Sequence, residues 1–172
     1  MKSVIMLTAL FTLCVSGVMA QKETKNFSIG FGLEAGAPTG ATSELYNFAT
    51  GLTIRFSYHA GPGFVTLTSG AIGYDPKTVV GQKKKAGLEI PVRAGYKYII
   101  AHHFFVMGEA GYSEFKTYFG ENGALASVSN GSFVAAPSLG VQFNAFEIGV
   151  RYNIVFSNGG GGLFAARLGF NF

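Results

Sequence analysis

Hydrophobic and polar residues alternate along most of the chain from Asn26 onward, with a period of two. The stretch 146–156, FEIGVRYNIVF, shows the pattern most clearly. Its alternate positions hold Phe146, Ile148, Val150, Tyr152, Ile154 and Phe156, and Glu147 and Arg151 lie between them. Because successive side chains of a β-strand point to opposite faces, this strand has one apolar face and one charged face.

The same alternation recurs often enough to predict eight strands in all. Besides 146–156, the predicted strands are 26–36, 48–60, 64–74, 87–100, 104–113, 132–144 and 163–172. The phase is weaker in 64–74, where Phe64, Ile72 and Tyr74 share one face. Pro91 and Pro137 fall within predicted strands, and since proline cannot donate to a ladder, we expect a bulge or a strand end at each.

The connections between these strands alternate in length. Segments 37–47, 75–86 and 114–131 are predicted long polar loops, and 157–162 is a shorter member of that class. Residues 61–63, 101–103 and 144–145 are predicted tight turns. An even number of antiparallel strands with long loops at one end and short turns at the other is typical of outer-membrane barrels. We therefore predict an all-β fold, an eight-stranded antiparallel up-and-down transmembrane β-barrel over residues 26–172.

The charged residues indicate which face lines the lumen. Nine of them share the polar phase of the strands, namely Glu34, Arg55, Glu89, Arg93, Lys97, Glu109, Glu147, Arg151 and Arg167. An eight-stranded barrel has an interior only just wide enough to be filled by side chains, so it has no room for the many Phe and Tyr residues of the other phase. The aromatic residues must then face lipid rather than fill a soluble barrel.

Aromatic residues near strand ends are expected to form girdles at the membrane interfaces. The candidates are Phe27, Tyr58, Tyr74, Tyr112, Phe156 and Phe172.

The first twenty residues have the features of a cleaved signal peptide. Lys2 is followed by an apolar run over 4–15 and a small-residue cleavage site at 18–20, which leaves 21–25 as a short N-terminal tail. Cleavage removes Cys14, the one cysteine, and excludes disulfide and thiolate chemistry. It also removes Lys2, leaving twelve basic and nine acidic residues, a net charge of +3 that is too small to indicate nucleic-acid binding.

The segments LEIPVRAGYKY (88–98), FFVMGEAGYS (104–113) and RLGFNF (167–172) resemble the small eight-stranded outer-membrane β-barrel proteins of Gram-negative bacteria, of the OmpX, OmpW and OmpA-barrel type. The resemblance extends over 26–172 and implies a location in the outer membrane. It also implies that Leu168, Phe170 and Phe172 form a C-terminal signal for the barrel-insertion machinery. The family includes adhesins, small-solute channels and lipid-modifying enzymes, so the resemblance leaves the activity open.

The inward charges are the main candidate constellation. Unpaired charges away from water are costly, so we expect them to pair across the lumen, with Lys97 and Glu109 as the first pair. A filled, salt-bridged lumen would be structural, whereas an open one would be a polar pore. The histidines 59, 102 and 103 map to short turns without metal-binding geometry. Ser57 and His59 share the inward phase, but no carboxylate is placed to orient them.

These observations predict an outer-membrane barrel with a structural or surface-interaction role and a closed, salt-bridged lumen. The alternative is a passive channel for small or apolar solutes, and a lipid-modifying enzyme is a third possibility. The expected partners are outer-membrane lipid, lipopolysaccharide and the insertion machinery. Lysines 83–85 in the second long loop are interpreted as a solvated segment, with contact to lipopolysaccharide phosphates as the alternative. No cofactor, metal, catalytic residue or nucleic acid is predicted.

Overall fold

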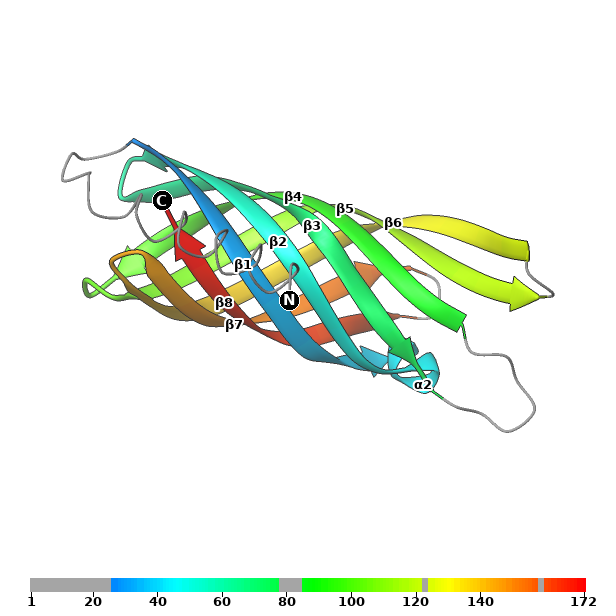
Figure 1. Cartoon of the computed structure of the whole chain (residues 1–172). Coiled ribbons are helices and arrows are strands. Elements are labelled where there is room, and N and C mark those ends of the chain that lie inside the picture. Colours follow the sequence, from blue (N-terminus) through cyan, green and yellow to red (C-terminus); the bar gives the residue numbers. More distant parts are fainter. Residues whose placement is uncertain (1–25, 78–84, 122–123, 158–159) are drawn as a thin grey trace, which may run out of the picture.

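The computed structural model describes residues 26–77, 85–121, 124–157 and 160–172, and these form one closed barrel. Each strand pairs antiparallel with its sequence neighbours, and β1 closes the barrel against β8 (Figure 1). The elements are β1 (Phe27–Gly40), α2 (Thr42–Leu45), β2 (Tyr46–Ala60), β3 (Gly63–Pro76), β4 (Lys85–Ile100), β5 (Phe104–Glu121), β6 (Ala124–Phe143), β7 (Phe146–Phe156) and β8 (Gly161–Asn171). The predicted eight-stranded up-and-down barrel is confirmed.

The structure also bears on the N-terminal segment, on possible membrane-spanning helices and on the tight turns. The predicted signal peptide and tail, residues 1–25, lie outside the described residues. No helix in the described part of the chain is long and apolar enough to cross a membrane. The three predicted tight turns all connect consecutive strands, at 61–62, 101–103 and 144–145.

The two chain ends of the barrel meet at the same rim as the tight turns. The backbone N–H of Phe172 donates to the carbonyl oxygen of Ile29 at 2.9 Å, and the N–H of Ile29 donates back at 3.3 Å. In the short turns, Ala101, His102 and Asn144 adopt positive φ values, which lets the chain reverse within a few residues. We call this rim the short-turn end.

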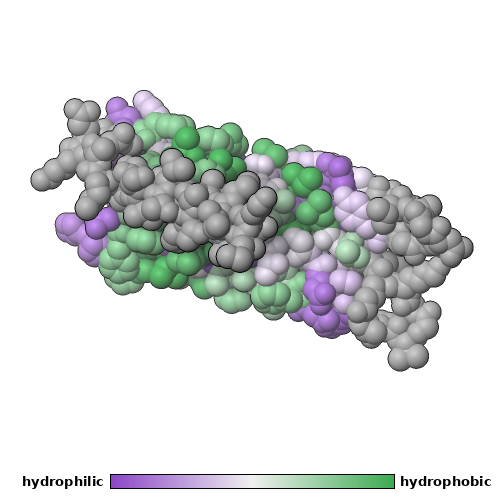
Figure 2. All heavy atoms as spheres, in the orientation of Figure 1, coloured by the Kyte–Doolittle hydropathy of each residue, from purple (hydrophilic) through white to green (hydrophobic). Residues whose placement is uncertain are grey.

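The inner and outer faces of the strands differ sharply in exposure. On β7, Phe146 and Phe156 are 56% and 62% exposed, whereas Glu147 and Arg151 are each 2% exposed. Figure 2 shows hydrophobic residues gathered across the middle of the visible face and hydrophilic residues toward both ends. An apolar band outside and charges inside is the distribution expected of a barrel whose surroundings are lipid.

Two of the predicted long loops are wrong. The segment 37–47 is mostly the end of β1 and the single helical turn α2, and the segment 114–131 is mostly strand, because β5 and β6 continue to Glu121 and from Ala124. Both segments are rich in Gly, Ser, Thr and Asn and lack the apolar alternation that marks the other strands, so their composition is that of loops. Residues 78–84 and 158–159 of the other two predicted loops lie outside the described residues.

The expected bulges or strand ends at the prolines are also wrong. Pro91 and Pro137 lie inside continuous strands, and the register is the same before and after each of them. Instead, the ladder lacks pairs on one side only, between β3 and β4 near Pro91 and between β6 and β7 near Pro137. Each proline is still paired on its other side, opposite Ser113 and Gly108 respectively. The pairing on the other side keeps each strand in the barrel, so the missing proline N–H interrupts the hydrogen-bond ladder without shifting its register.

The strands β5 and β6 form a hairpin that projects past the rim opposite the short turns (Figure 1). The strand β4 accompanies β5 as far as Phe119, whereas β7 pairs with β6 only from Phe133 onward. Within the described residues, positions 124–132 of β6 therefore have a strand partner on their β5 side alone. This segment is a free sheet edge, which we call the β6 edge.

The β6 edge predicts an alternating pattern of hydrogen exchange. Amides of 124–132 that point away from β5 should exchange rapidly with deuterium, and the alternate amides should be protected, because only the latter are hydrogen-bonded. The stretch 138–141 of the same strand is paired on both sides and should be protected throughout. Residue-resolved NMR on the refolded barrel checks this, and uniform protection over 124–132 would show that the edge is covered.

Candidate functional site

The structure places all nine predicted charged residues inside the barrel, where none is more than 4% exposed. They come from six strands, as follows: Glu34 on β1, Arg55 on β2, Glu89, Arg93 and Lys97 on β4, Glu109 on β5, Glu147 and Arg151 on β7, and Arg167 on β8. All nine are inward because they share the polar phase of the alternation. Seven of them are joined by ion pairs into one group, which we call the lumen cluster.

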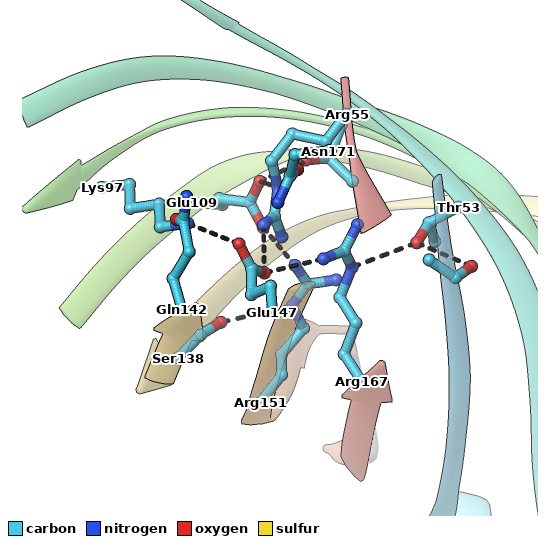
Figure 3. A network of polar contacts seen from close by, with 12 residues as sticks. Thr53, Arg55, Lys97, Glu109, Ser138, Gln142, Glu147, Arg151, Arg167 and Asn171 are labelled. Atoms are coloured by element: carbon cyan, nitrogen blue, oxygen red, sulfur yellow. Dashed lines mark hydrogen bonds and ion pairs between the residues drawn. The ribbon is translucent and has the colours of Figure 1, made fainter. Parts of the chain in front are cut away.

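Glu147 is the point where most of the cations meet (Figure 3). Its Oε1 lies 2.7 Å from Nη1 of Arg55 and 2.7 Å from Nη1 of Arg167. Its Oε2 accepts from Nζ of Lys97, which also donates to the side chain of Gln142. A single carboxylate thus connects cations from β2, β4 and β8, on strands that are far apart in the sequence.

Arg151 connects the other two carboxylates of the cluster. Its Nη1 donates to Glu34 at 2.6 Å, and its Nη2 donates to Glu109 at 2.8 Å. Arg167 also approaches Glu34, with Nε 3.6 Å from Oε1. The planar fork of a guanidinium can satisfy two acceptors at once, which a single ammonium group does less well.

Neutral side chains extend the lumen cluster to the two strands that carry none of its charges. Thr68 of β3 accepts from Nε of Arg55 at 3.1 Å and donates to Glu109 at 2.5 Å. On β6, Gln142 accepts from Lys97, and Ser138 accepts from Arg151 at 3.3 Å. Every strand of the barrel therefore contributes a side chain to one continuous polar network.

The predicted pairing of Lys97 with Glu109 is wrong. Lys97 pairs with Glu147 instead, and its Nζ also lies 4.3 Å from the ring centroid of Phe105. Glu109 is occupied by Arg151 and Thr68. In the hairpin Lys97 lies opposite Met107 and Glu109 lies opposite Gly95, so the two are only diagonal neighbours. In this narrow lumen, contacts between side chains from opposite walls decide the pairing of Lys97, and closeness within the hairpin does not.

Glu89 and Arg93 also lie inside the barrel, but among the described residues no ion pair joins either of them to the lumen cluster. Glu89 accepts hydrogen bonds from Tyr74 at 2.5 Å and from Ser113 at 2.8 Å. Arg93 donates to Asn153 at 2.5 Å. Its Nε and Nη2 have no hydrogen-bond partner in the described part of the chain. This pair of residues forms a second, smaller polar layer.

Two glycines of the inward phase make room for Arg167. A Cβ at Gly32 would lie 2.5 Å from Nε of Arg167, and a Cβ at Gly169 would lie 2.5 Å from its Nη1. Any larger residue at these positions would displace the guanidinium. The need for space around Arg167 therefore explains why glycine occupies these two inward positions of the strands.

The lumen also holds an apolar layer that the sequence did not predict. Tyr46, Tyr74 and Phe115 pack edge to face, with ring centroids 5.1–5.8 Å apart. Ala49, Ile72, Leu163 and Ala165 complete this group, which we call the aromatic plug. It lies between the lumen cluster and the projecting end of the barrel. Tyr74 of the plug also donates to Glu89, so the aromatic plug adjoins the smaller polar layer.

The aromatic plug corrects one prediction and explains why it was missed. Tyr74, expected in an interfacial girdle, is buried in the lumen. Tyr46 and Phe115 fell in segments interpreted as loops. Tyr46 and Phe48 are two residues apart but face opposite sides, because the register between β2 and β3 shifts between them. The sequence gives one indication of the inward position: Ile72 and Tyr74 lie on the same face of their strand as the polar residues Thr66 and Thr68.

The C-terminal residues of the predicted insertion signal lie on the outside of the short-turn end. Leu168 is exposed, and Phe170 packs against Phe146 and Phe172 with ring centroids 4.9 and 4.7 Å apart. Phe172 also meets the ring of Phe31 edge to face. These contacts form an aromatic row at the seam between β1 and β8. Its role in insertion remains a prediction.

The other chemistry considered from the sequence does not assemble into a site in the described residues. No group of three or more metal-binding side chains occurs among them. Near the short turns, His59 meets the ring of Phe64 edge to face, and His103 lies tilted against the ring of Phe143. Ser57 is buried while His59 is exposed, and no hydrogen bond of the described residues joins them.

Removing one member of the lumen cluster should destabilise the barrel strongly. Arg151→Ala leaves Glu34 and Glu109 buried without their main partner, which costs about 3–5 kcal/mol in the free energy of unfolding. Lys116→Ala is a matched control, because its pair with Glu114 is half-exposed and screened by solvent, so stability should barely change. Denaturant titration of both variants in phospholipid vesicles measures this, and equal stability of Arg151→Ala and the parent would contradict a stabilising network.

Comparison with known proteins shows the same architecture. No protein-family model and no curated protein sequence matches the chain. Among solved structures, the chain is similar to Ail, the attachment invasion locus protein of Yersinia pestis, with a TM-score of 0.63 and 18% identity over 85% of this chain and 97% of that chain.

It is also similar to two other barrels. The N-terminal β-barrel domain of Pseudomonas aeruginosa OprF matches with a TM-score of 0.64 and 14% identity, over 86% of this chain and 98% of that one. Neisserial surface protein A matches with a TM-score of 0.55 and 14% identity, over the same shares of the two chains. The chain thus has the fold of the small eight-stranded outer-membrane β-barrels.

Proposed function

We propose that this chain is an integral outer-membrane β-barrel protein with a closed lumen, which has a structural or surface-interaction role and no catalytic one. The observation that carries the proposal is the lumen cluster, in which side chains from all eight strands are bonded to one another. A lumen built this way fixes the strands in register and leaves no path for a solute.

The membrane location is supported by the outer face of the barrel. Large apolar side chains such as Leu52, Phe133 and Leu139 are 60–70% exposed there. In water such a band would be an aggregation hazard, whereas in lipid it is the stable arrangement. Apart from the interruptions near Pro91 and Pro137, the closed ladder also satisfies the backbone hydrogen bonds of the wall without water, as a spanning structure requires.

The closed lumen is supported by two layers that block it independently. The lumen cluster fills the half nearer the short turns, and the aromatic plug fills the half nearer the projecting hairpin. An eight-stranded barrel leaves little cross-section once its interior side chains are packed. A passive channel would need both layers to move aside.

A surface-interaction role is supported by the β6 edge. Among the described residues, the backbone groups of 124–132 have no strand partner on the side away from β5. Such an edge is a template for an added strand from another protein, a common mode of recognition between proteins. We further propose that the outer face contacts membrane lipid and lipopolysaccharide, and that Leu168, Phe170 and Phe172 are recognised by the insertion machinery.

The closed lumen predicts electrical silence. Refolded protein in planar bilayers should give no discrete, reproducible current steps, because the interior holds no continuous water path. Arg151→Ala should also be silent, since the aromatic plug remains in place when the lumen cluster is weakened. Insertion is verified first by the change in gel mobility between unheated and boiled samples. Reproducible openings in the parent would favour the channel alternative.

The membrane location predicts that a charge on the outer face is tolerated at the rim but not at the middle. Leu52→Arg, near the middle of β2, should lower the free energy of unfolding in vesicles by about 2–4 kcal/mol, because the guanidinium enters hydrocarbon. Leu45→Arg, the control at the rim in α2, should change it by about 0–1 kcal/mol. Equal effects at the two positions, measured by urea titration, would contradict a lipid-facing band.

A further inference from the structure

The outer wall of the barrel contains an apolar groove of about 600 Å³ across β4 to β8. Its walls are the rings of Tyr96, Tyr98, Tyr152 and Phe164, and its floor includes Gly108 and Pro137. Wells of this volume with mostly apolar walls are the usual shape of sites for small hydrophobic ligands. A second depression of about 570 Å³, at Gly131, Ser132, Phe156 and Ser157, is lined mainly by small polar residues and glycine and has one aromatic ring.

The groove exists because its floor lacks side chains. A Cβ built at Gly108 would meet no atom within 4 Å, so this position is open space. Pro137 lies directly opposite Gly108 on β6, at the place where the ladder with β7 is interrupted. The register on either side of the interruption is intact, so the depression is a fixed part of the wall.

Two of the walls are held in position by hydrogen bonds. The Tyr96 hydroxyl donates to the carbonyl oxygen of Ala60 at 2.8 Å. The Tyr152 hydroxyl lies 3.1 Å from Oγ1 of Thr39, on the far side of β8. Rings held at their tips do not collapse into the groove, and a ligand would not have to order them on binding.

The barrel wall is thin behind the groove. Met107, Ser138 and Arg151 line both the groove and a small cavity of about 10 Å³ on the lumen side. Arg151 is one of the central members of the lumen cluster, yet it is 2% exposed and its charge is satisfied inside. The groove therefore offers apolar contact without a free charge, which fits a hydrocarbon chain rather than a charged group.

We propose that the groove holds one acyl chain of a phospholipid, bound at a fixed position on the barrel. The proposal rests on the membrane location proposed above, because the groove is continuous with the apolar outer face. Its lower wall lies close to the short turns, since Tyr98 is three residues from Ala101. Outer-membrane barrels have their short turns on the periplasmic side, so the acyl chain enters from the periplasmic leaflet, which consists of phospholipid. The bound chain covers the interrupted ladder at Pro137 and so completes the wall in front of the lumen cluster.

Native mass spectrometry of the full chain tests this. The protein is refolded into vesicles of phosphatidylethanolamine and phosphatidylglycerol that also contain lipopolysaccharide, and then transferred to mild detergent. The parent should retain one phospholipid. Gly108→Phe should lose it, because the new ring occupies the open floor. Val150→Phe, from the opposite wall, is a second variant that fills the same space.

Ala71→Phe is the matched control, because Ala71 is an exposed outward residue of β3, a strand that contributes no residue to the groove, and the variant adds the same ring there. It should retain the phospholipid as the parent does. A parent without retained phospholipid, retention of lipopolysaccharide instead, or equal retention in Gly108→Phe would overturn the proposal. Insertion of each variant is followed by its heat-dependent gel mobility, so failure of the barrel to enter membranes, which would contradict the proposed function, is distinguished from loss of the lipid site.

Discussion

The structure depends on the mutual satisfaction of charges inside a barrel whose outside is apolar. Glu34, Glu109 and Glu147 meet Arg55, Lys97, Arg151 and Arg167 in a space closed to water. A buried charge without a partner is strongly unfavourable, so each of these groups requires that the others stand at the right height in the lumen. Because the members come from strands distributed around the whole barrel, their pairing is possible only when the barrel is closed and in register. The network thus couples the last strand to the first more firmly than the backbone ladder alone.

The cluster depends in turn on what surrounds it along the barrel axis. Glycines next to Arg167 leave space for its guanidinium, and the hydroxyl and amide groups of Thr68, Ser138 and Gln142 add hydrogen bonds to Arg55, Arg151 and Lys97. Toward the projecting end, the aromatic plug replaces polar contacts by packed rings. The interior therefore changes from charged to apolar within one lumen. The aromatic plug thus separates the lumen cluster from the projecting end of the barrel.

The exterior departs from a smooth wall at two places, and both arise where the ladder is incomplete. Beyond the rim, β6 outruns β7 and leaves an unpaired edge. Within the wall, Pro137 withholds a backbone donor, and the bare positions around it form the groove. In a closed barrel the backbone is otherwise satisfied by its neighbours, so these interruptions are where other molecules can make contacts that the fold itself does not use. The first faces water and suits a protein strand, whereas the second faces hydrocarbon and suits a lipid.

The sequence by itself determined the strands, their number and their two faces, because a period of two places every inward and outward residue without reference to any partner. It identified the nine inward charges for the same reason. It did not determine which charges pair, because the tilt and stagger of the strands decide which side chains lie at the same level in the lumen. For this reason Lys97 pairs with Glu147 rather than with Glu109. It also missed the projecting ends of β5 and β6, where Gly, Ser and Asn interrupt the apolar alternation, and the inward position of Tyr46, which a register shift reverses. Only the closed tertiary structure, in which all strands adjust to one another, decided these features.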